Sequence, residues 1–270
     1  MNNEKLSAVG IFDTHAHYFD RRFANETEGA DIILERDVFG AGIDGVINVG
    51  TNNQNSRVCV EMAKKYDKMY VAAGIHPEDI RDITSTPEQE CERLAELFSD
   101  KSNKVVALGE IGLDYHWEGF DKELQKRYFE LQMNMAVQLD IPVVIHDREA
   151  HGDCFDMIMK FPKARGVFHS FSGSVEMARE LVKRGWYISF SGVLTFKNAR
   201  KTVETAAQIP SDMILIETDA PYLAPHPHRG KINHSGLMIH TAEKLAEIRG
   251  ISFEEAVALT RKNTKALFGI

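Results

Sequence analysis

Short apolar segments alternate with longer amphipathic segments along almost the whole chain. The short segments are rich in Val and Ile and apolar nearly throughout, which is typical of strands buried on both faces of a parallel sheet. They predict β-strands over residues 10–14, 45–49, 69–74, 105–109, 142–145, 166–169, 186–190 and 213–216.

The longer segments carry apolar residues at the three- and four-residue spacing of an α-helix. Some have clear ends, such as Thr86 before Pro87 at a start and Gly185 after Arg184 at an end. The predicted helices cover residues 32–41, 53–66, 87–99, 121–139, 150–161, 175–184, 199–208, 236–249 and 253–268. Because each strand is followed by a helix and eight such units close a barrel, the pattern predicts an α/β fold, a (β/α)8 TIM barrel.

An open, doubly wound sheet is the alternative α/β architecture. It is disfavoured because the first strand-to-helix turn, residues 13–17, lacks the glycine-rich phosphate-binding sequence of that class. The length of 270 residues is usual for one barrel, and no stretch rich in Pro, Gly or Ser separates two parts. We therefore expect a single domain over residues 1–270.

Composition and charge exclude several classes of protein. No apolar run approaches the roughly 20 residues of a membrane span, and residues 1–7 lack the apolar core of a signal peptide, so we expect a cytoplasmic protein without a membrane partner. Cys59, Cys91 and Cys154 lie far apart, which argues for reduced, buried thiols rather than disulfides or a cysteine-ligated zinc site. The net charge of −8 argues against a nucleic-acid coating protein but permits an enzyme that meets phosphates at a local metal site. Nothing in the sequence indicates an obligate protein partner.

Two histidines, His15 and His17, follow Asp13 where the first predicted strand ends. Side chains two residues apart in a strand project from the same face, so both imidazoles would reach one point. Imidazole is the commonest metal ligand in proteins, although histidine pairs at this spacing also occur by chance. The pair is therefore a candidate metal site that needs further ligands.

Those ligands are expected at the carboxyl ends of other strands, where β/α barrels carry their functional groups. Glu110 follows the fourth predicted strand, His146 the fifth and Asp219 the eighth, and His169 ends the sixth. Four imidazoles and two carboxylates are thus expected at the C-terminal face of the strands.

Six nitrogen and oxygen ligands exceed the three protein ligands of a catalytic zinc site, and this excess predicts two divalent ions. Glu110 is the expected bridge, because a carboxylate can bind two ions and an imidazole cannot. His15, His17 and Asp219 come from the first and last strands, which adjoin in a barrel, so we expect them to share one ion with Glu110. The imidazoles that follow the fifth and sixth strands would hold the other ion. The donors are compatible with Zn²⁺, Mn²⁺, Ni²⁺ or Mg²⁺.

Five segments resemble motifs of the TatD family of metal-dependent deoxyribonucleases, which have amidohydrolase-like barrels: residues 13–17, 109–115, 145–150, 169–173 and 217–225. The resemblance spans nearly the whole chain. It implies metal-dependent hydrolysis of DNA phosphodiester bonds, with exonuclease action as the favoured mode, and it implies the same six ligands. The chain departs from the family pattern after Lys231, where Ile232-Asn233-His234-Ser235 replaces the usual Arg-Asn-Glu-Pro. An acid and a rigid proline near the site are lost, which affects substrate preference.

In the implied reaction, divalent ions activate water and polarise a phosphate, and DNA is the substrate. Asp219 and Glu110 are the predicted catalytic residues, with Asp219 as the acceptor of a proton from the water. The alternative is that Asp219 serves only as a ligand, as many carboxylates at metal sites do.

Five further side chains are predicted to contact the substrate. Arg148 could clamp a phosphate or pair with a neighbouring acid, and His76 could contact the phosphate or be an ordinary loop histidine. Glu217 is a substrate contact, a partner of a metal ligand or a hydrogen-bonded carboxylate without a catalytic role. Arg229 and Lys231 form a small basic spot after the last strand.

Three aromatic residues, Tyr115, Trp117 and Tyr222, could stack on bases, although aromatic residues more often belong to a core. Two other functions would use the predicted ligands. One is a metal-dependent amidohydrolase acting on a small amide, lactone or ester. The other is a barrel that only binds a partner, which a complete ligand set disfavours.

Overall fold

The computed structural model describes residues 10–270, so the expectation that residues 1–7 are not a signal peptide lies outside the described residues. The chain forms two compact units, one containing the residues up to Asn48 together with His169–Ile270, the other Val49–Phe168. Among the described helices, none combines the length and apolar composition that a membrane crossing requires. The three cysteines are unpaired; Cys59 and Cys154 are buried, and Cys91 is partly buried.

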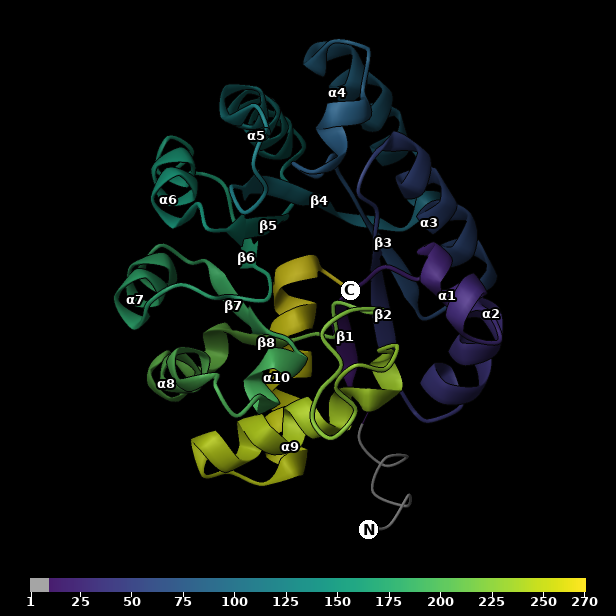
Figure 1. Ribbon diagram of the computed structural model, residues 1–270, viewed down its shortest axis with the longest axis vertical. Helices are drawn as coiled ribbons and strands as arrows, with labels where there is room; N and C mark the ends of the chain where they lie inside the picture. Colours follow the sequence, from purple (N-terminus) through teal and green to yellow (C-terminus); the bar gives the residue numbers. More distant parts are fainter. Residues whose placement is uncertain (1–9) are drawn as a thin grey trace. The chain divides into compact units, whose positions relative to one another are not determined.

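The first unit contains two pairs of parallel strands (Figure 1). Strand β1 (Phe12–Ala16) pairs with β2 (Gly45–Val49), and β7 (Tyr187–Phe190) pairs with β8 (Ile214–Ile216). Ala16, the last residue of β1, bridges Ala220 in parallel, and α10 packs against both β1 and β8. The helices of this unit are α1 (Arg21–Glu26), α2 (Ala30–Ile33) with a π-helical continuation (Leu34–Phe39), α7 (Val175–Lys183), α8 (Arg200–Gln208), α9 (Met238–Arg249) and α10 (Phe253–Phe268), with short 3-10 turns at Gly192–Thr195, Ser211–Met213 and Ser235–Leu237.

The second unit contains four parallel strands in chain order (Figure 1). They are β3 (Met69–Ala73), β4 (Val105–Asp114), β5 (Val143–Arg148) and β6 (Gly166–Phe168). The helices are α3 (Asn53–Lys65), α4 (Pro87–Ala95), α5 (Lys122–Leu139) and α6 (His151–Met159), with 3-10 turns at Asp79–Asp82, Glu96–Phe98 and Lys101–Asn103. Helix α4 begins at the predicted Thr86-Pro87 signal, where Thr86 and Gln89 form a reciprocal capping box.

The alternation of strands and helices confirms the predicted fold class. The strand order is β1 to β8, every strand is followed by helical structure, and this order is that of a (β/α)8 barrel. The strands consist almost entirely of buried residues, as their apolar sequences predicted. The single domain over residues 1–270 stays a prediction.

Several element boundaries differ from the predicted ones, and three differences concern the functional residues. Strand β1 is shifted toward the C-terminus and includes His15. Strand β4 continues beyond Gly109 to Asp114, so Glu110 lies inside it, and β5 likewise includes His146. The reason is that the polar end of β4 is as buried as its apolar start, a property that apolar patterning does not reveal.

The sequence predicts one α-helix over residues 32–41, where the structure has α2 and its π-helical continuation. The short helix α1 was not predicted. Helix α1 has only Phe23 buried and is capped by the carboxylate of Asp20, so it lacks an apolar period that a sequence could show.

Candidate metal centre

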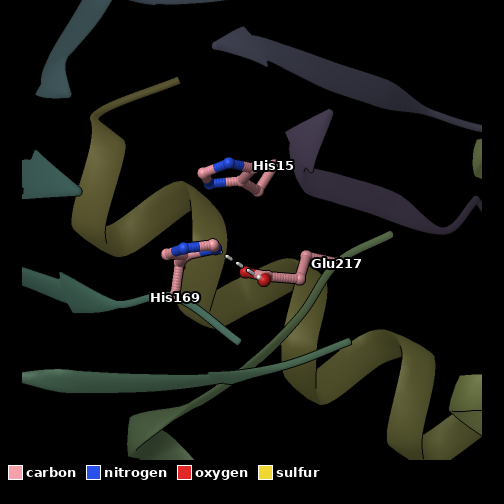
Figure 2. A group of neighbouring side chains, drawn as sticks. All are labelled: His15, His169 and Glu217. Atoms are coloured by element: carbon pink, nitrogen blue, oxygen red, sulfur yellow. Dashed lines mark hydrogen bonds and ion pairs between the residues drawn. The ribbon is translucent and has the colours of Figure 1, made fainter. Parts of the chain in front are cut away.

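Five side chains gather beside the ends of β1 and β8 in the first unit, and we call them the His15 cluster: His15, His17, His169, Glu217 and Asp219. The Nε2 atoms of His15 and His17 lie 3.0 Å apart. Asp219 Oδ1 lies 3.7 Å from His15 Nε2 and 3.4 Å from His17 Nε2. The ring of His169 stacks on that of His15 with centroids 4.1 Å apart, and its Nδ1 lies 3.2 Å from Glu217 Oε1 (Figure 2). Ring nitrogens and carboxylate oxygens therefore converge here.

The hydrogen bonds of Glu217 indicate whether the His15 cluster can hold a metal ion. Glu217 is 1% exposed, and its Oε1 accepts a hydrogen bond of 2.8 Å from the backbone N–H of Ser170. Its Oε2 is buried without a hydrogen-bond partner. An unsatisfied buried carboxylate oxygen is costly, and a cation would remove that cost. Ligand atoms of His15, His169 and Glu217 lie within 4.8 Å of one another, so the residues fit a divalent ion.

Asp13 fixes the backbone that carries this cluster. Its Oδ1 accepts from the N–H groups of His15 (3.1 Å) and Thr218 (3.0 Å). Its Oδ2 accepts from the hydroxyls of Thr218 and Ser235, both at 2.6 Å. Burial raises the pKa of Asp13 to about 6, despite these hydrogen bonds. The N–H of Asp219 also donates to the carbonyl of His15 at 2.9 Å, so β1 and the segment after β8 are joined at the ligands themselves.

Asp219 carries a negative charge at neutral pH. Burial by itself raises its pKa, but the hydrogen bond with His17 and the charges of His169 and His15 outweigh burial and lower the pKa below its usual value. The backbone of Asp219 has a φ of 59°, a left-handed conformation that Asp tolerates better than most residues. An ionised carboxylate beside imidazoles suits both a ligand and a proton acceptor.

Four side chains form the Glu110 cluster in the second unit: His76, Glu110, Asp114 and His146. His146 lies between two carboxylates, with Nδ1 2.7 Å from Glu110 Oε1 and Nε2 2.9 Å from Asp114 Oδ2. His76 Nε2 lies 3.6 Å from Glu110 Oε1. Glu110 and Asp114 are four residues apart on β4, an even spacing that directs both to one side of the strand. Ligand atoms of His76, Glu110 and His146 form a second group within 4.8 Å.

The two carboxylates of the Glu110 cluster are buried. Burial raises the pKa of Asp114, but the hydrogen bond and charge of His146 outweigh it and lower the pKa to about 2. Asp114 therefore remains ionised and orients His146.

Each of the six predicted ligands lies in one of these clusters. The His15 cluster contains His15, His17, His169 and Asp219, and the Glu110 cluster contains the other two. The assignment of ligands to particular ions, including the bridging role of Glu110, stays a prediction.

The predicted substrate contacts occupy different surroundings. His76 and Glu217 are part of the clusters, where both are candidate ligands. Arg148, at the end of β5, lies near Glu78 (3.9 Å) and Asp114 (4.0 Å) rather than pairing with an adjacent acid. Arg229 and Lys231 are exposed, and the Arg229 guanidinium lies 4.1 Å from the ring centre of Phe196.

Asp114, Asp13 and the loop residue Asn233 are structural contributors that sequence reasoning missed. Asp114 was not predicted because the predicted strand ends at Gly109. The even spacing of Asp114 from Glu110 was the feature of the sequence that could have identified it. Asn233 lies in the loop that departs from the family pattern. Its side chain donates to the carbonyls of Thr218 (2.9 Å) and Tyr222 (2.8 Å), which supports the segment that carries Asp219.

Comparisons with known proteins agree with this geometry. The family described as TatD related DNase matches residues 12–269. An uncharacterized metal-dependent hydrolase of Bacillus subtilis, YabD, is 38% identical over 262 residues, covering 96% of this chain and 99% of the relative. The uncharacterized metal-dependent hydrolase TatD of Mycobacterium tuberculosis is 31% identical, covering 96% and 98%. The crystal structure of YjjV, a TatD homologue from Escherichia coli, superposes with a TM-score of 0.87 at 29% identity, covering 96% of this chain and 98% of that one.

Proposed function

The chain belongs to the TatD family of metal-dependent hydrolases, and from that premise we propose that it hydrolyses phosphodiester bonds of DNA, as an exonuclease. The observation that carries the proposal is the His15 cluster, where buried imidazoles and carboxylates converge around a carboxylate oxygen that lacks a hydrogen-bond donor. A non-enzymatic binding role gives no reason for such a costly arrangement.

We propose that residues of the His15 cluster and the Glu110 cluster hold two divalent ions. Neither cluster contains a thiolate, and mixed imidazole and carboxylate donors suit Zn²⁺, Mn²⁺, Ni²⁺ or Mg²⁺. When bound, such ions activate water and polarise a phosphate.

The chain's own residues then position the substrate and move the proton. Asp219 is ionised, lies beside two imidazoles and is our proton acceptor. Arg148 is close to the Glu110 cluster, and its half-exposed guanidinium can donate to a phosphate. Arg229 and Lys231, both exposed, are proposed to contact the DNA backbone further from the reacting bond.

The test is digestion of end-labelled single-stranded and double-stranded DNA and RNA across a panel of metals. We expect hydrolysis to stop on chelation, to return with Mn²⁺ or Mg²⁺, and to fall by about 10²–10⁴-fold in Asp219→Asn and Glu110→Gln. His226→Ala, which changes an exposed loop histidine, is the matched control and keeps its activity. Hydrolysis that survives chelation contradicts the proposal. Activity on cyclic amides or lactones with none on DNA would assign the amidohydrolase alternative.

A further inference from the structure

An exposed aromatic ring stands beside the Glu110 cluster. Trp117 follows β4 and is 50% exposed, although burying an indole ring is strongly favourable. Its position is fixed: Nε1 donates to Glu78 Oε1 at 3.0 Å, and the ring of His116 meets it edge-on with centroids 4.8 Å apart. His116 is itself held by Glu149 at 2.7 Å. The ring is thus exposed and oriented at the same time.

Arg148 links this ring to the Glu110 cluster. Its guanidinium carbon lies 5.6 Å from the centre of the Trp117 ring, a cation–π arrangement. The same guanidinium lies 4.0 Å from Asp114 Oδ2, and that oxygen is bonded to His146 Nε2 at 2.9 Å. Trp117 and Arg148 are therefore connected through Asp114 to a candidate metal ligand.

A flat apolar face next to a guanidinium is complementary to a nucleotide. The face stacks on a base, and the guanidinium donates to a phosphate. A base inside a duplex already has both faces stacked, whereas an unpaired base has a free face for the ring. Because a hydrogen bond and a ring contact already orient the indole, little conformational entropy is lost on binding.

We propose that Trp117 and Arg148 form a platform that stacks on an unpaired nucleobase and binds its phosphate. The proposal rests on the proposed function for its choice of DNA. It assigns to Trp117 a binding role and to Arg148 a phosphate contact next to the Glu110 cluster.

Tryptophan fluorescence gives a direct test. The chain has two tryptophans, and the other, Trp186, is 3% exposed, so a Trp186→Phe protein reports on Trp117 alone. We expect an oligothymidylate to quench this emission, measured with and without Mn²⁺. Trp117→Ala should weaken binding roughly 5- to 100-fold, the range measured for a base stacked on an aromatic ring, while Trp117→Phe retains most of it. Met159→Ala, which truncates an exposed apolar side chain on α6, is the matched control and should bind as the unmodified protein does.

A strand of abasic sites with the same length and charge separates stacking from general damage. On this strand Trp117→Ala should cost nothing, because no base is present to stack. Equal losses on both strands, or no quenching under either metal condition, overturn the platform.

The outcomes also distinguish the platform from the nuclease activity. Quenching with a base-dependent loss, but without DNA hydrolysis, retains the platform and rejects the nuclease. Hydrolysis of single-stranded DNA whose KM is unchanged in Trp117→Ala rejects the platform alone. A platform predicts a raised KM with kcat nearly unchanged, since the ring holds substrate without touching the reacting bond.

Discussion

The His15 cluster and the Glu110 cluster contain the same types of ligand but have different surroundings. Four of the five side chains of the His15 cluster are buried and Asp219 is partly exposed; the cluster lies in a backbone fixed by Asp13, which accepts four hydrogen bonds. The Glu110 cluster has buried carboxylates too, but it adjoins the half-exposed Arg148 and the exposed Trp117. Under the proposed function, the difference predicts that the first cluster holds an ion rigidly, whereas the second also receives substrate.

The largest effect expected from this comparison is on folding, at Asp13. In Asp13→Ala the N–H of Thr218 and the hydroxyl of Ser235 lose a buried acceptor, which should lower the free energy of unfolding by roughly 3 kcal/mol or more. Urea denaturation measures the loss. Asp82→Ala, at a highly exposed acid, is the control and should change stability little.

Asp13→Asn sharpens the same prediction. The amide keeps one acceptor oxygen, and the hydroxyls of Thr218 and Ser235 can rotate to accept from its NH₂ group, so its cost should be smaller than that of Ala. Equal stability of Asp13→Ala and the unmodified protein would contradict the rigid character of the His15 cluster.

The next effect concerns the Glu110 cluster and appears in metal binding rather than in folding. Asp114 orients His146, and loss of such a partner typically costs 10- to 100-fold in metal affinity or activity. We expect Asp114→Asn to weaken Mn²⁺ binding by about this factor, measured by calorimetric titration. Asp156→Asn, on α6, is the control. If Asp114→Asn bound metal normally, the contact between Asp114 and His146 would have no role in holding the ion.

Many members of both clusters could be predicted from the sequence, because apolar strands with polar ends identify the residues at the carboxyl ends of the strands. Glu110 and His146 were predicted as ligands, although the predicted strands end just before these residues. Asp114 was not found, because a buried acid within a strand has the same polar pattern as a loop. The role of Asp13 also required the structure, since its partners Thr218 and Ser235 lie more than 200 positions away in the chain.

A smaller effect is expected at Ser235, in the loop that departs from the family pattern. Ser235→Ala removes one of the four hydrogen bonds to Asp13 and should lower the free energy of unfolding by about 1 kcal/mol. Ser99→Ala is the matched control: it also removes one side-chain hydrogen bond, to the carbonyl of Glu96, but on the exposed surface, where the loss should change stability little. A loss in Ser235→Ala as large as that in Asp13→Ala would mean that the loop, rather than the four bonds together, fixes the cluster.

The smallest expected effect is a pH dependence at His234, the neighbour of Ser235. Burial lowers its pKa below 6.5; the charge of Asp37 opposes this, while those of His228 and Arg36 add to it. The unfolded chain therefore binds more protons than the folded one as the pH falls below 6.5, so this histidine's contribution is fully present above 6.5 and is lost as the pH falls through the lower folded pKa.

His234→Gln should remove this dependence. The difference in unfolding midpoint between the unmodified protein and His234→Gln should shift in favour of the variant between pH 7.5 and pH 5, measured by urea denaturation. His226→Gln, at an exposed histidine in the same segment, is the matched control. A constant difference for His234→Gln would mean that the buried ring is protonated as readily in the folded chain as in the unfolded one. Metal affinity measured over the same pH range then tells whether the loop acts on the His15 cluster, because the neighbours of His234 on both sides, Asn233 and Ser235, bond to Thr218 and Asp13.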